Sequence, residues 1–379
     1  WILHEISLML VTYVRNPYYP KVDPLGQQLP YIDRLEAHDV GQEEIMVAKA
    51  STGQVSFSGD ILRTRDIPLL KRGEKANGYR TYIWRRVQGA DVIIQPNLTH
   101  RDPKVRELMQ DRRFRRALSL AVNRDEINKI VYFGHAQPRQ VTVIPSSRYY
   151  KKEFAEAYAA FDPSEARRLL DEIGLVDRTG DGMRDRPDGK PLSIVLEWTD
   201  IETPKQHTME LVTAHWREVG LDISMREIHM SLQGTRTRAN LMDMSLWHAD
   251  RCTDILFPVN PYWFVPSQLG HEECHWTEWA RWAVTDGTKG EKPPPKIMQL
   301  VTWWNQMSTS MDPEEQRALG RKILASQAEN VWSIGTLGMA PKPIVVSTRL
   351  RNVPKLGYWG WDSRWTFPYH PCTWYLVDE

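Results

Sequence analysis

The chain has 379 residues, 41% of them hydrophobic, and its 49 Lys and Arg residues almost balance its 48 Asp and Glu residues. This length predicts two or three domains, and the balanced charge argues against nucleic acid or an anionic membrane as a ligand. The sequence contains no apolar run of 18 residues, so no transmembrane helix is predicted. Three cysteines are too few for a disulfide scaffold, and a Cys252–Cys274 bridge is left open but not indicated.

Residues 1–98 carry mostly short strand patterns. The strands are predicted at residues 1–6, 8–14, 32–40, 54–60, 79–87 and 90–97, the last two as a pair around Gly89. Helices are predicted at residues 41–52 and 66–73. The connector RNPYYPKVDPLGQQLPYIDRLE, residues 15–36, is rich in proline and tyrosine, which predicts a surface loop held by the packing of these residues.

From His100 onward helical patterns dominate. Asn123 with Glu126, and Asp162 with Glu165, have the spacing of helix N-caps. Residues 192–198, 202–220 and 221–228 read as strand, helix and strand, and this β-α-β order predicts that the two strands pair in parallel. The later elements are a strand at 241–247, helices at 296–308 and 312–331, and strands at 334–338 and 343–350.

The order of these patterns predicts the domain organisation. A strand-rich part, an α/β part and a strand-rich tail indicate one domain that the chain leaves and re-enters, with a second domain inserted. We therefore expect residues 1–98 and 336–379 in the first lobe and residues 99–335 in the second. Two crossovers, near Asn97 and Pro341, would then form a hinge on which a clamshell closes over a ligand.

The segment DRTGDGMRDRPDG has the spacing of a calcium-binding loop. Oxygen ligands at alternate positions and a glycine at the sharp turn suit Ca²⁺. The candidate metal ligands are Asp177, Thr179, Asp181, Met183, Asp185 and Asp188. Thr at the third position and the short Asp at the twelfth depart from the pattern. Such loops also form metal-free turns, in which Asp side chains bond their own backbone.

A second segment, HEECH, His271 to His275, carries metal-binding residue types. It lacks the second cluster that a zinc site requires, which favours a surface loop. Motifs of nucleophilic and nucleotide-dependent enzymes, such as GxSxG, GxGxxG and the P-loop, do not occur. The sequence therefore gives no support to an enzyme.

Two compositional features are interpreted as structural. The basic run DRRFRRALS is interpreted as a solvated helix face around a buried Phe114 rather than as a phosphate site. Its arginines are Arg112, Arg113, Arg115 and Arg116. The 16 tryptophans are interpreted mainly as core residues, with a cleft lined by indole rings as the alternative.

Three phrases, RNPYYPKVDPLGQQLPYIDRLE, DRRFRRALSLAVNRDEINKIVYFGHAQP and FDPSEARRLLDEIGLVDRTGDGMRDRPDGKPL, match a family pattern in order and spacing. The sequence resembles the family 5 solute-binding proteins of ABC transporters, the oligopeptide, dipeptide and nickel type of extracytoplasmic receptor. The resemblance implies an α/β fold of the periplasmic-binding-protein type (type II), a two-lobe clamshell whose first lobe is discontinuous. It also implies that an N-terminal portion with a signal peptide precedes Trp1 in intact members, so that the first lobe is incomplete here.

The resemblance further implies a function. The protein would be a periplasmic or extracytoplasmic monomer that captures a peptide or a similar oligomeric solute and delivers it to the membrane permease subunits of an ABC importer. It would perform no catalysis, bind no nucleic acid and need no cofactor, with a structural calcium ion in the aspartate-rich loop as the one candidate. The alternative from another class is a metal-dependent hydrolase that uses the Asp177–Asp188 loop or the His271–His275 segment.

The candidate solute-binding residues combine this resemblance with side-chain chemistry. Relatives hold a ligand amine with an acidic residue beyond a Trp-containing strand end, which matches LWHADRCTDILFP here. Two arginines are candidates for a ligand carboxylate, because a guanidinium binds it with two parallel bonds, and two tryptophans are candidate walls. The residues are Trp247, Asp250, Asp254, Arg236, Arg238, Trp263 and Trp332. For each of them, packing in the core is the alternative.

Overall fold

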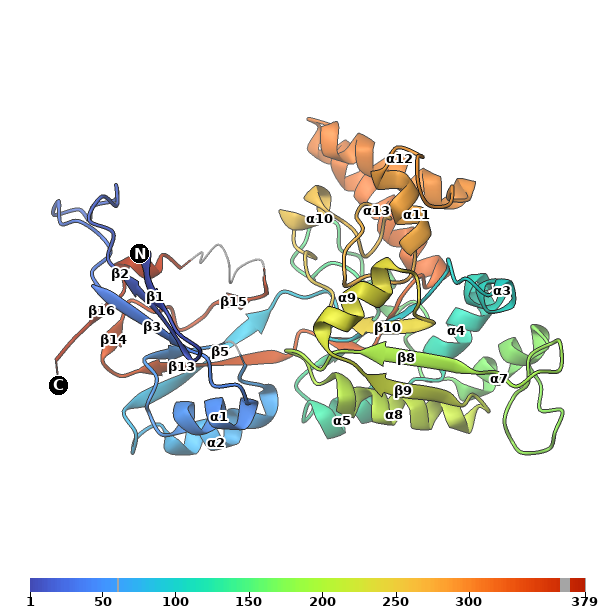
Figure 1. Cartoon of the computed structure of the whole chain (residues 1–379), viewed down its shortest axis with the longest axis horizontal. Helices are drawn as coiled ribbons and strands as arrows, with labels where there is room; N and C mark the ends of the chain where they lie inside the picture. The colour runs from blue at the N-terminus through green and yellow to red at the C-terminus, as the bar shows by residue number, and fades with distance from the viewer. Residues whose placement is uncertain (60, 362–368, 379) are drawn as a thin grey trace. The chain divides into compact units, whose positions relative to one another are not determined.

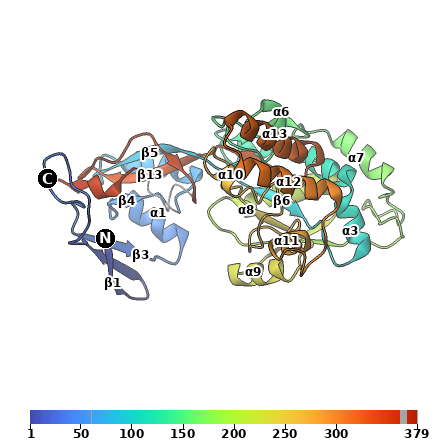
Figure 2. The same ribbon diagram turned by 90° about the horizontal axis from the view of Figure 1, so that it is seen from above.

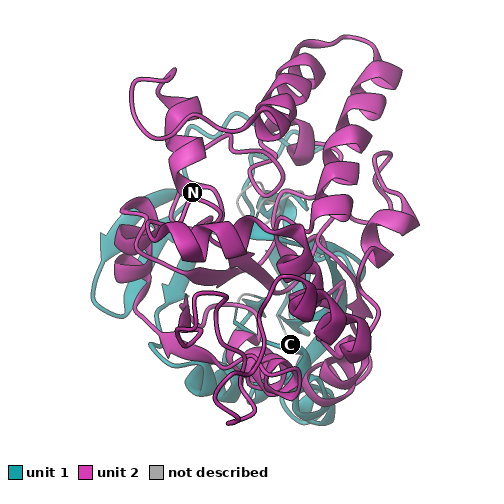
Figure 3. Cartoon of the chain, turned by 90° about the vertical axis from the view of Figure 1, so that its right-hand side faces the viewer, with its two compact units in different colours: residues 1–86, 341–379 teal, residues 87–340 magenta. Residues whose placement is uncertain are grey.

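The computed structural model describes residues 1–59, 61–361 and 369–378. The chain forms two compact units, residues 1–86 with 341–379 (unit 1) and residues 87–340 (unit 2), coloured separately in Figure 3. The chain therefore leaves unit 1 once and returns to it, which is the discontinuous arrangement expected from the order of the sequence patterns. Among the described residues, no helix has the length and apolar character needed to cross a membrane.

Unit 1 contains a three-stranded and a four-stranded sheet. The first is an antiparallel meander of β1 (Ile2–Ile6), β2 (Leu10–Val14) and β3 (Arg34–His38). The second has the order β15-β5-β13-β4 and consists of β15 (Tyr358–Trp359), β5 (Tyr79–Arg86), β13 (Pro341–Ser347) and β4 (Phe57–Ser58). β5 and β13 pair antiparallel along most of their length, and this long-range pair joins the two chain segments of unit 1.

The remaining elements of unit 1 are short. They are α1 (Glu43–Ser51), α2 (Ile67–Gly73), the 3-10 helices η1 (Thr64–Asp66) and η2 (Pro371–Thr373), and the strand pair β14 (Leu350–Arg351) and β16 (Tyr375–Leu376). An aromatic core of Trp84, Trp359 and Trp374 packs with Ile344 and Val346. Asp60, the last residue of the strand predicted at 54–60, lies outside the described residues.

The connector at residues 15–36 is the surface loop that its composition predicts. Hydrogen bonds cross it: Gln28 Nε2 donates to the carbonyl of Pro17 at 2.7 Å, and the hydroxyl of Tyr31 donates to Asp23 Oδ2 at 2.6 Å. The Tyr31 ring also packs edge-on against Tyr375 at 6.2 Å, so polar contacts and ring packing both hold the loop.

Unit 2 is built on a five-stranded sheet with the order β11-β6-β10-β8-β9. Its strands are β6 (Ile93–Pro96), β8 (Ile194–Trp198), β9 (Ile223–Glu227), β10 (Met244–Trp247) and β11 (Ile334–Gly335). β8 is parallel to both β9 and β10, which confirms the predicted β-α-β pairing, whereas β6 is antiparallel to β10 and β11. The crossover from β8 to β9 and the return to β10 run in opposite directions across the sheet. Right-handed crossovers therefore place α8 and α9 on opposite faces (Figure 1).

Helices make up most of the rest of unit 2. They are α3 (Pro103–Gln110), α4 (Arg112–Leu120), α5 (Arg124–Val131), α6 (Lys152–Glu156), α7 (Pro163–Glu172), α8 (Lys205–Glu218), α9 (Met230–Arg238), α10 (Leu256–Val259), α11 (Thr277–Val284), α12 (Pro295–Thr309) and α13 (Pro313–Asn330). The short strands β7 (Gln137–Pro138) and β12 (Leu337–Gly338) pair with each other. α12 and α13 pack side by side (Figure 2).

The predicted N-caps are confirmed. Asn123 Oδ1 accepts a hydrogen bond from the backbone N–H of Glu126 at 3.1 Å, and Asp162 Oδ1 accepts one from Glu165 at 2.9 Å. In each case the side chain satisfies an N–H group that the first turn of the helix leaves without an intrahelical partner.

The predicted pairing of residues 79–87 with 90–97 is wrong. β5 lies in the four-stranded sheet of unit 1, and β6 pairs with β10 and β11 in unit 2. For the same reason the first change of unit falls after Arg86, before β6, and not at residue 98. The return falls at Pro341, where β13 begins, and not at residue 336, because β11 and β12 still pair within unit 2.

The interpretation of the DRRFRRALS run as a solvated face is wrong for Arg115. This side chain is buried and donates to the carbonyls of Met109, Asn330 and Val331. Its neighbour Arg112 is exposed, as expected. Burial lowers the pKa of Arg115 to about 9, and it bonds main-chain carbonyls in place of the water that a solvated arginine would contact.

Candidate functional site

The carboxyl ends of two parallel strands meet at one edge of the unit 2 sheet. β8 ends at Trp198 and β10 at Trp247, and the antiparallel β6 begins at the same edge, where Ile93 pairs with Trp247. The segment before β6 continues the pairing, since Gly89 N–H donates to Ala249 O at 2.7 Å. Ligands of α/β proteins bind most often beyond the carboxyl ends of parallel strands, which makes this edge the first place to search for a site.

Four polar side chains converge there, and we call them the strand-end cluster: Gln88, Glu202, His248 and Asp250. Gln88 Nε2 donates to Glu202 Oε1 at 3.1 Å and to Asp250 Oδ1 at 3.0 Å. His248 Nε2 lies 3.3 Å from Glu202 Oε2 and 3.1 Å from Asp250 Oδ2. An amide and an imidazole thus hold two carboxylates side by side.

The strand-end cluster is removed from solvent. The side chains of His248, Glu202 and Asp250 are 1%, 5% and 7% exposed. Burial raises the pKa of Asp250 above its ordinary value, and the neighbouring His248 works in the opposite direction. A buried carboxylate is stable only when it is paired and hydrogen-bonded, and the observed bonds to Gln88 and His248 meet that requirement.

The backbone around the cluster is held in an unfavourable conformation. Glu202 and Arg251 have φ values of 63° and 56°, in the left-handed region that residues with a Cβ atom rarely adopt. Such conformations persist only where the surrounding contacts impose them, and they gather at functional sites. In this chain one of them belongs to a cluster residue and the other follows Asp250 directly.

Aromatic side chains enclose the cluster on two sides. The Trp247 ring stacks on His248, with centroids 5.0 Å apart, and meets His271 edge-on at 5.6 Å. Trp263 Nε1 donates to the carbonyl of Asp250 at 3.0 Å, and its ring lies 4.3 Å from that of Tyr262. The structure therefore brings together three of the predicted solute-binding residues: Trp247, Asp250 and Trp263.

The other predicted solute-binding residues are engaged elsewhere. Asp254 accepts hydrogen bonds from Ser147 and from the backbone of Arg148. Arg236 pairs with the buried Glu197 at 2.9 Å, and Arg238 is exposed in the last turn of α9. The Trp332 ring receives the Arg115 guanidinium at 4.8 Å. Trp332 precedes β11, whose Ile334 pairs with Ile94, and this places it toward the edge of the sheet opposite the cluster.

Sequence reasoning missed Gln88, Glu202 and His248. His248 stands between two residues that were identified, in the text LWHAD. Glu202 follows the strand β8 by a short loop, and a search for polar residues after both parallel strands would have found it. Gln88 carried no local signal, because its position depends on the pairing of β6 with β10.

The HEECH segment is not the surface loop that its composition predicts. Glu273, Cys274 and His275 are buried. Cys274 Sγ donates to the carbonyl of Gln95, and His275 Nδ1 lies 2.9 Å from Gln95 Oε1. Burial raises the pKa of Glu273 to about 8, with the charge of Glu272 adding to it, and burial lowers the pKa of His275 to about 3. No disulfide joins Cys252 to Cys274.

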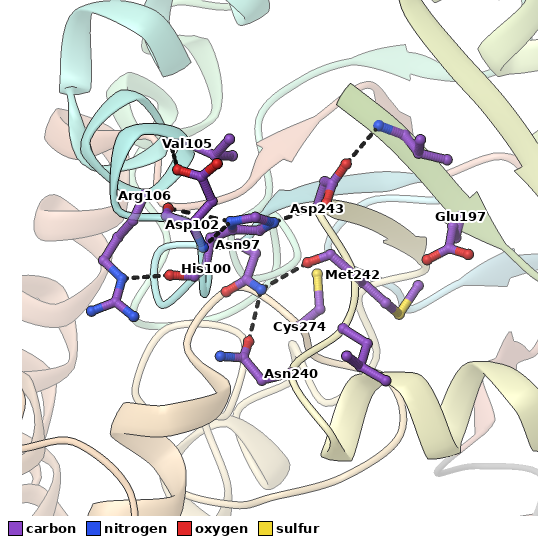
Figure 4. A network of polar contacts seen from close by, with 12 residues as sticks. Asn97, His100, Asp102, Val105, Arg106, Glu197, Asn240, Met242, Asp243 and Cys274 are labelled. Carbon is purple, nitrogen blue, oxygen red and sulfur yellow. Dashed lines mark hydrogen bonds and ion pairs between the residues drawn. The ribbon is translucent and has the colours of Figure 1, made fainter. Parts of the chain in front are cut away.

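At the opposite edge of the sheet, a second polar network has a structural role (Figure 4). Asn97 donates both to Asn240 Oδ1 and to the carbonyl of Met242, each at 2.8 Å. His100 Nε2 lies 2.9 Å from Asp243 Oδ1, and the other carboxylate oxygen of Asp243 accepts the N–H of Val195. These bonds tie the loops after β6 and before β10 to the start of β8.

The aspartate-rich loop uses its carboxylates to bond its own backbone. Asp177 accepts hydrogen bonds from the N–H groups of Thr179, Gly180 and Gly182, which hold its pKa below the ordinary value. Asp181 accepts one from Met183. The remaining candidate ligands bond within or beside the loop: Asp185 accepts the N–H of Arg178, and Asp188 pairs with Arg186. Within residues 1–59, 61–361 and 369–378, no three His, Cys, Asp or Glu side chains are placed to hold a metal ion. The calcium site and the metal-free turn both stay predictions, which melting curves with and without calcium distinguish.

We expect removal of Asp177 to matter more than removal of calcium. Asp177→Ala should lower the melting temperature, because three backbone N–H groups lose their acceptor. The loss should be largest above the ordinary Asp pKa and should fade in acid, since a depressed pKa stabilises the fold only while the carboxylate is ionised. Melting curves with excess EGTA or with calcium should coincide for the unaltered chain. A rise in melting temperature with calcium that Asp177→Ala abolishes would instead establish a metal loop.

Two units, one of them discontinuous, with a polar cluster at the strand ends of the inserted unit, define a two-lobe α/β binding protein of the periplasmic type. The sequence matches the model of the bacterial extracellular solute-binding proteins, family 5 (middle), over residues 9–267, and the chain belongs to this family. Proteins of this family bind solutes for transport and are not enzymes, so the hydrolase alternative is wrong.

Individual relatives agree with this assignment. The periplasmic alpha-galactoside-binding protein of Rhizobium meliloti is 24% identical over 360 residues, which is 91% of this chain and 50% of that protein. The oligopeptide-binding protein AppA of Bacillus subtilis is 26% identical over 204 residues, 53% of this chain and 35% of that one. The chain thus spans half or less of the length of these curated relatives.

Solved structures share the fold. An oligopeptide-binding protein OppA superimposes with a TM-score of 0.72 and 28% identity, covering 98% of this chain and 61% of the other. The periplasmic binding protein MelB of Agrobacterium fabrum, solved with stachyose, gives a TM-score of 0.81 at 19% identity, covering 99% and 56%.

Proposed function

We propose that this chain is part of the extracytoplasmic solute-binding component of an ABC importer. It captures a peptide or a similar oligomeric solute and delivers it, as a monomer, to the membrane permease subunits. Family membership supports the transport role. The relatives' names include both oligopeptides and alpha-galactosides. The class of solute must therefore be inferred from the residues of the site.

The observation that carries this proposal is the strand-end cluster. Two buried carboxylates at the carboxyl ends of β8 and β10 are held by Gln88 and His248 and enclosed by Trp247 and Trp263. Small-molecule sites usually combine aromatic and apolar side chains with a few convergent polar groups, and the cluster has both kinds of residue. Asp250 is one of the two aspartates, with Asp254, that the family resemblance offers for the solute, and it is the one that belongs to this cluster.

Isothermal titration calorimetry with a panel of short peptides and neutral oligosaccharides tests this function. We expect at least one compound to bind, and Asp250→Asn to weaken that binding at least tenfold, because the variant loses a carboxylate that accepts hydrogen bonds. The control is Asp125→Asn, an exposed aspartate of α5, which should leave the affinity unchanged. Binding of no compound from either class, or repeated turnover of a bound one, would contradict the proposal.

A further inference from the structure

Building on the proposed function, we infer that the strand-end cluster recognises a neutral, hydroxyl-bearing solute, an oligosaccharide, in preference to the free amine of a peptide. Glu202 is then a second specificity-determining residue beside Asp250. Three features of the described residues support this reading: the charge already present at the cluster, two polar groups that have no partner, and the contacts that reach the surface.

The two carboxylates already have an imidazole beside them, and two cationic side chains lie close to the cluster. His248 lies within 3.3 Å of both carboxylates. Lys205 is buried, donates to the carbonyl of Ile201, and holds its ammonium 5.5 Å from the centre of the Trp247 ring. Arg251, next to Asp250 in sequence, stacks on Tyr262 at 5.1 Å. An ammonium group of a solute would have to enter beside Lys205 and Arg251, and like charges repel strongly where water is excluded.

The hydrogen-bonding groups that remain also favour a hydroxyl. The indole N–H of Trp247 and the hydroxyl of Thr203 are buried, 3% and 0% exposed, and have no hydrogen-bond partner among the described residues. A buried polar group without a partner costs about 1–3 kcal/mol, so a solute that satisfies it gains affinity. An ammonium only donates hydrogen bonds, whereas a hydroxyl donates to a carboxylate and also accepts from an indole N–H.

The cluster connects to the surface through His271. The side chain of His271 is 37% exposed and contacts the edge of the Trp247 ring, and it lies 3.6 Å from the partly exposed Glu272. Glu272 accepts the hydroxyl of Tyr262 at 2.6 Å. The Trp247 ring therefore lies between the buried His248 and the partly exposed His271, and aromatic faces of this kind suit the rings of a sugar.

Calorimetry with three probes tests the inference: stachyose, tetra-alanine with a free amine, and N-acetyl-tetra-alanine amide. We expect stachyose to bind at least tenfold more tightly than either peptide, with little dependence on salt. Glu202→Gln should weaken stachyose at least tenfold, because its amide replaces one acceptor oxygen with a donor. The matched control is Glu210→Gln, an exposed glutamate of α8, which should change nothing.

A second variant keeps the inference testable if Glu202→Gln does not fold. Thr203→Val keeps the side-chain shape, removes only the hydroxyl, and should weaken stachyose about three- to tenfold. Tight binding of tetra-alanine that acetylation of its amine abolishes would overturn the inference while leaving the proposed function intact. Stachyose affinity unchanged in both variants would overturn it as well. Binding of neither class would remove the proposed function together with the inference.

Discussion

Arg115→Met is expected to lower the free energy of unfolding of unit 2 by about 3–5 kcal/mol. The guanidinium donates to the carbonyls of Asn330 and Val331 at 3.0–3.1 Å and to that of Met109 at 2.5 Å. It also lies over the Trp332 ring. Methionine fills similar space but leaves these buried carbonyls without donors, and each such loss costs about 1–3 kcal/mol. Guanidinium-induced unfolding, followed by tryptophan fluorescence, measures the change.

The matched control is Arg112→Met on the same helix. Arg112 is 56% exposed and pairs with the exposed Glu329 at 3.6 Å, so its loss should change the unfolding free energy by less than about 0.5 kcal/mol. Equal effects of the two substitutions would mean that Arg115 does not stabilise the fold through its carbonyl contacts. The comparison also separates the buried arginine of α4 from the exposed ones, since Arg112 and Arg116 reach the end of α13 only at Glu329, on the surface.

Much of the fold follows from local pattern. The helices at α4, α5 and α7 and the β8-α8-β9 unit lie where periodicity and capping residues place them, because these signals act within a few residues of the chain. The pairing of β5 with β13 spans more than two hundred and fifty residues, and no local sequence signal near Tyr79 predicts which strand it pairs with. The mistaken pairing of 79–87 with 90–97 arose because adjacent strands separated by a glycine usually form a hairpin.

Burial of polar residues was the least predictable property. Arg115 and the segment Glu273–His275 have the composition of surface residues, yet each finds main-chain or side-chain partners inside unit 2. Such partners come from distant segments, such as Gln95 for His275. The candidate site was only partly predicted, because some of its residues also come from distant segments. Family resemblance points to Asp250 and Trp247, which stand in one phrase, whereas Glu202 and Gln88 reach the cluster only through the order of strands in the sheet.

Glu273→Gln is expected to change how the stability of unit 2 depends on pH. Burial, together with the charge of Glu272, raises the pKa of Glu273 from 4.5 to about 8, and its Oε1 accepts the N–H of Gly270 at 2.8 Å. A carboxyl group whose pKa is raised in the folded state favours the fold while it is protonated. Its contribution is therefore complete below about pH 4.5 and is lost as the pH rises through about 8.

The size of this effect follows from the shift. Each pKa unit corresponds to about 1.4 kcal/mol, so ionising Glu273 should cost the fold several kcal/mol by pH 9. Glutamine is neutral at every pH and nearly the same shape. The variant should match the unaltered chain at pH 5 and exceed it by several kcal/mol at pH 9. Guanidinium unfolding at pH 5, 7 and 9 gives the comparison, with Glu107→Gln, whose side chain is 76% exposed, as the control.

His275, in the same segment, should lower the stability of unit 2 at acidic pH. Burial lowers its pKa from 6.5 to about 3, so its contribution is present above pH 6.5 and is lost as the pH falls toward 3. The two residues together predict that the free energy of unfolding is highest between about pH 4.5 and 6.5. Glu273→Gln should remove only the decline at higher pH. An alkaline decline that persists unchanged in Glu273→Gln would show that another group titrates there and that the Glu273 carboxyl is ionised in the folded protein at neutral pH.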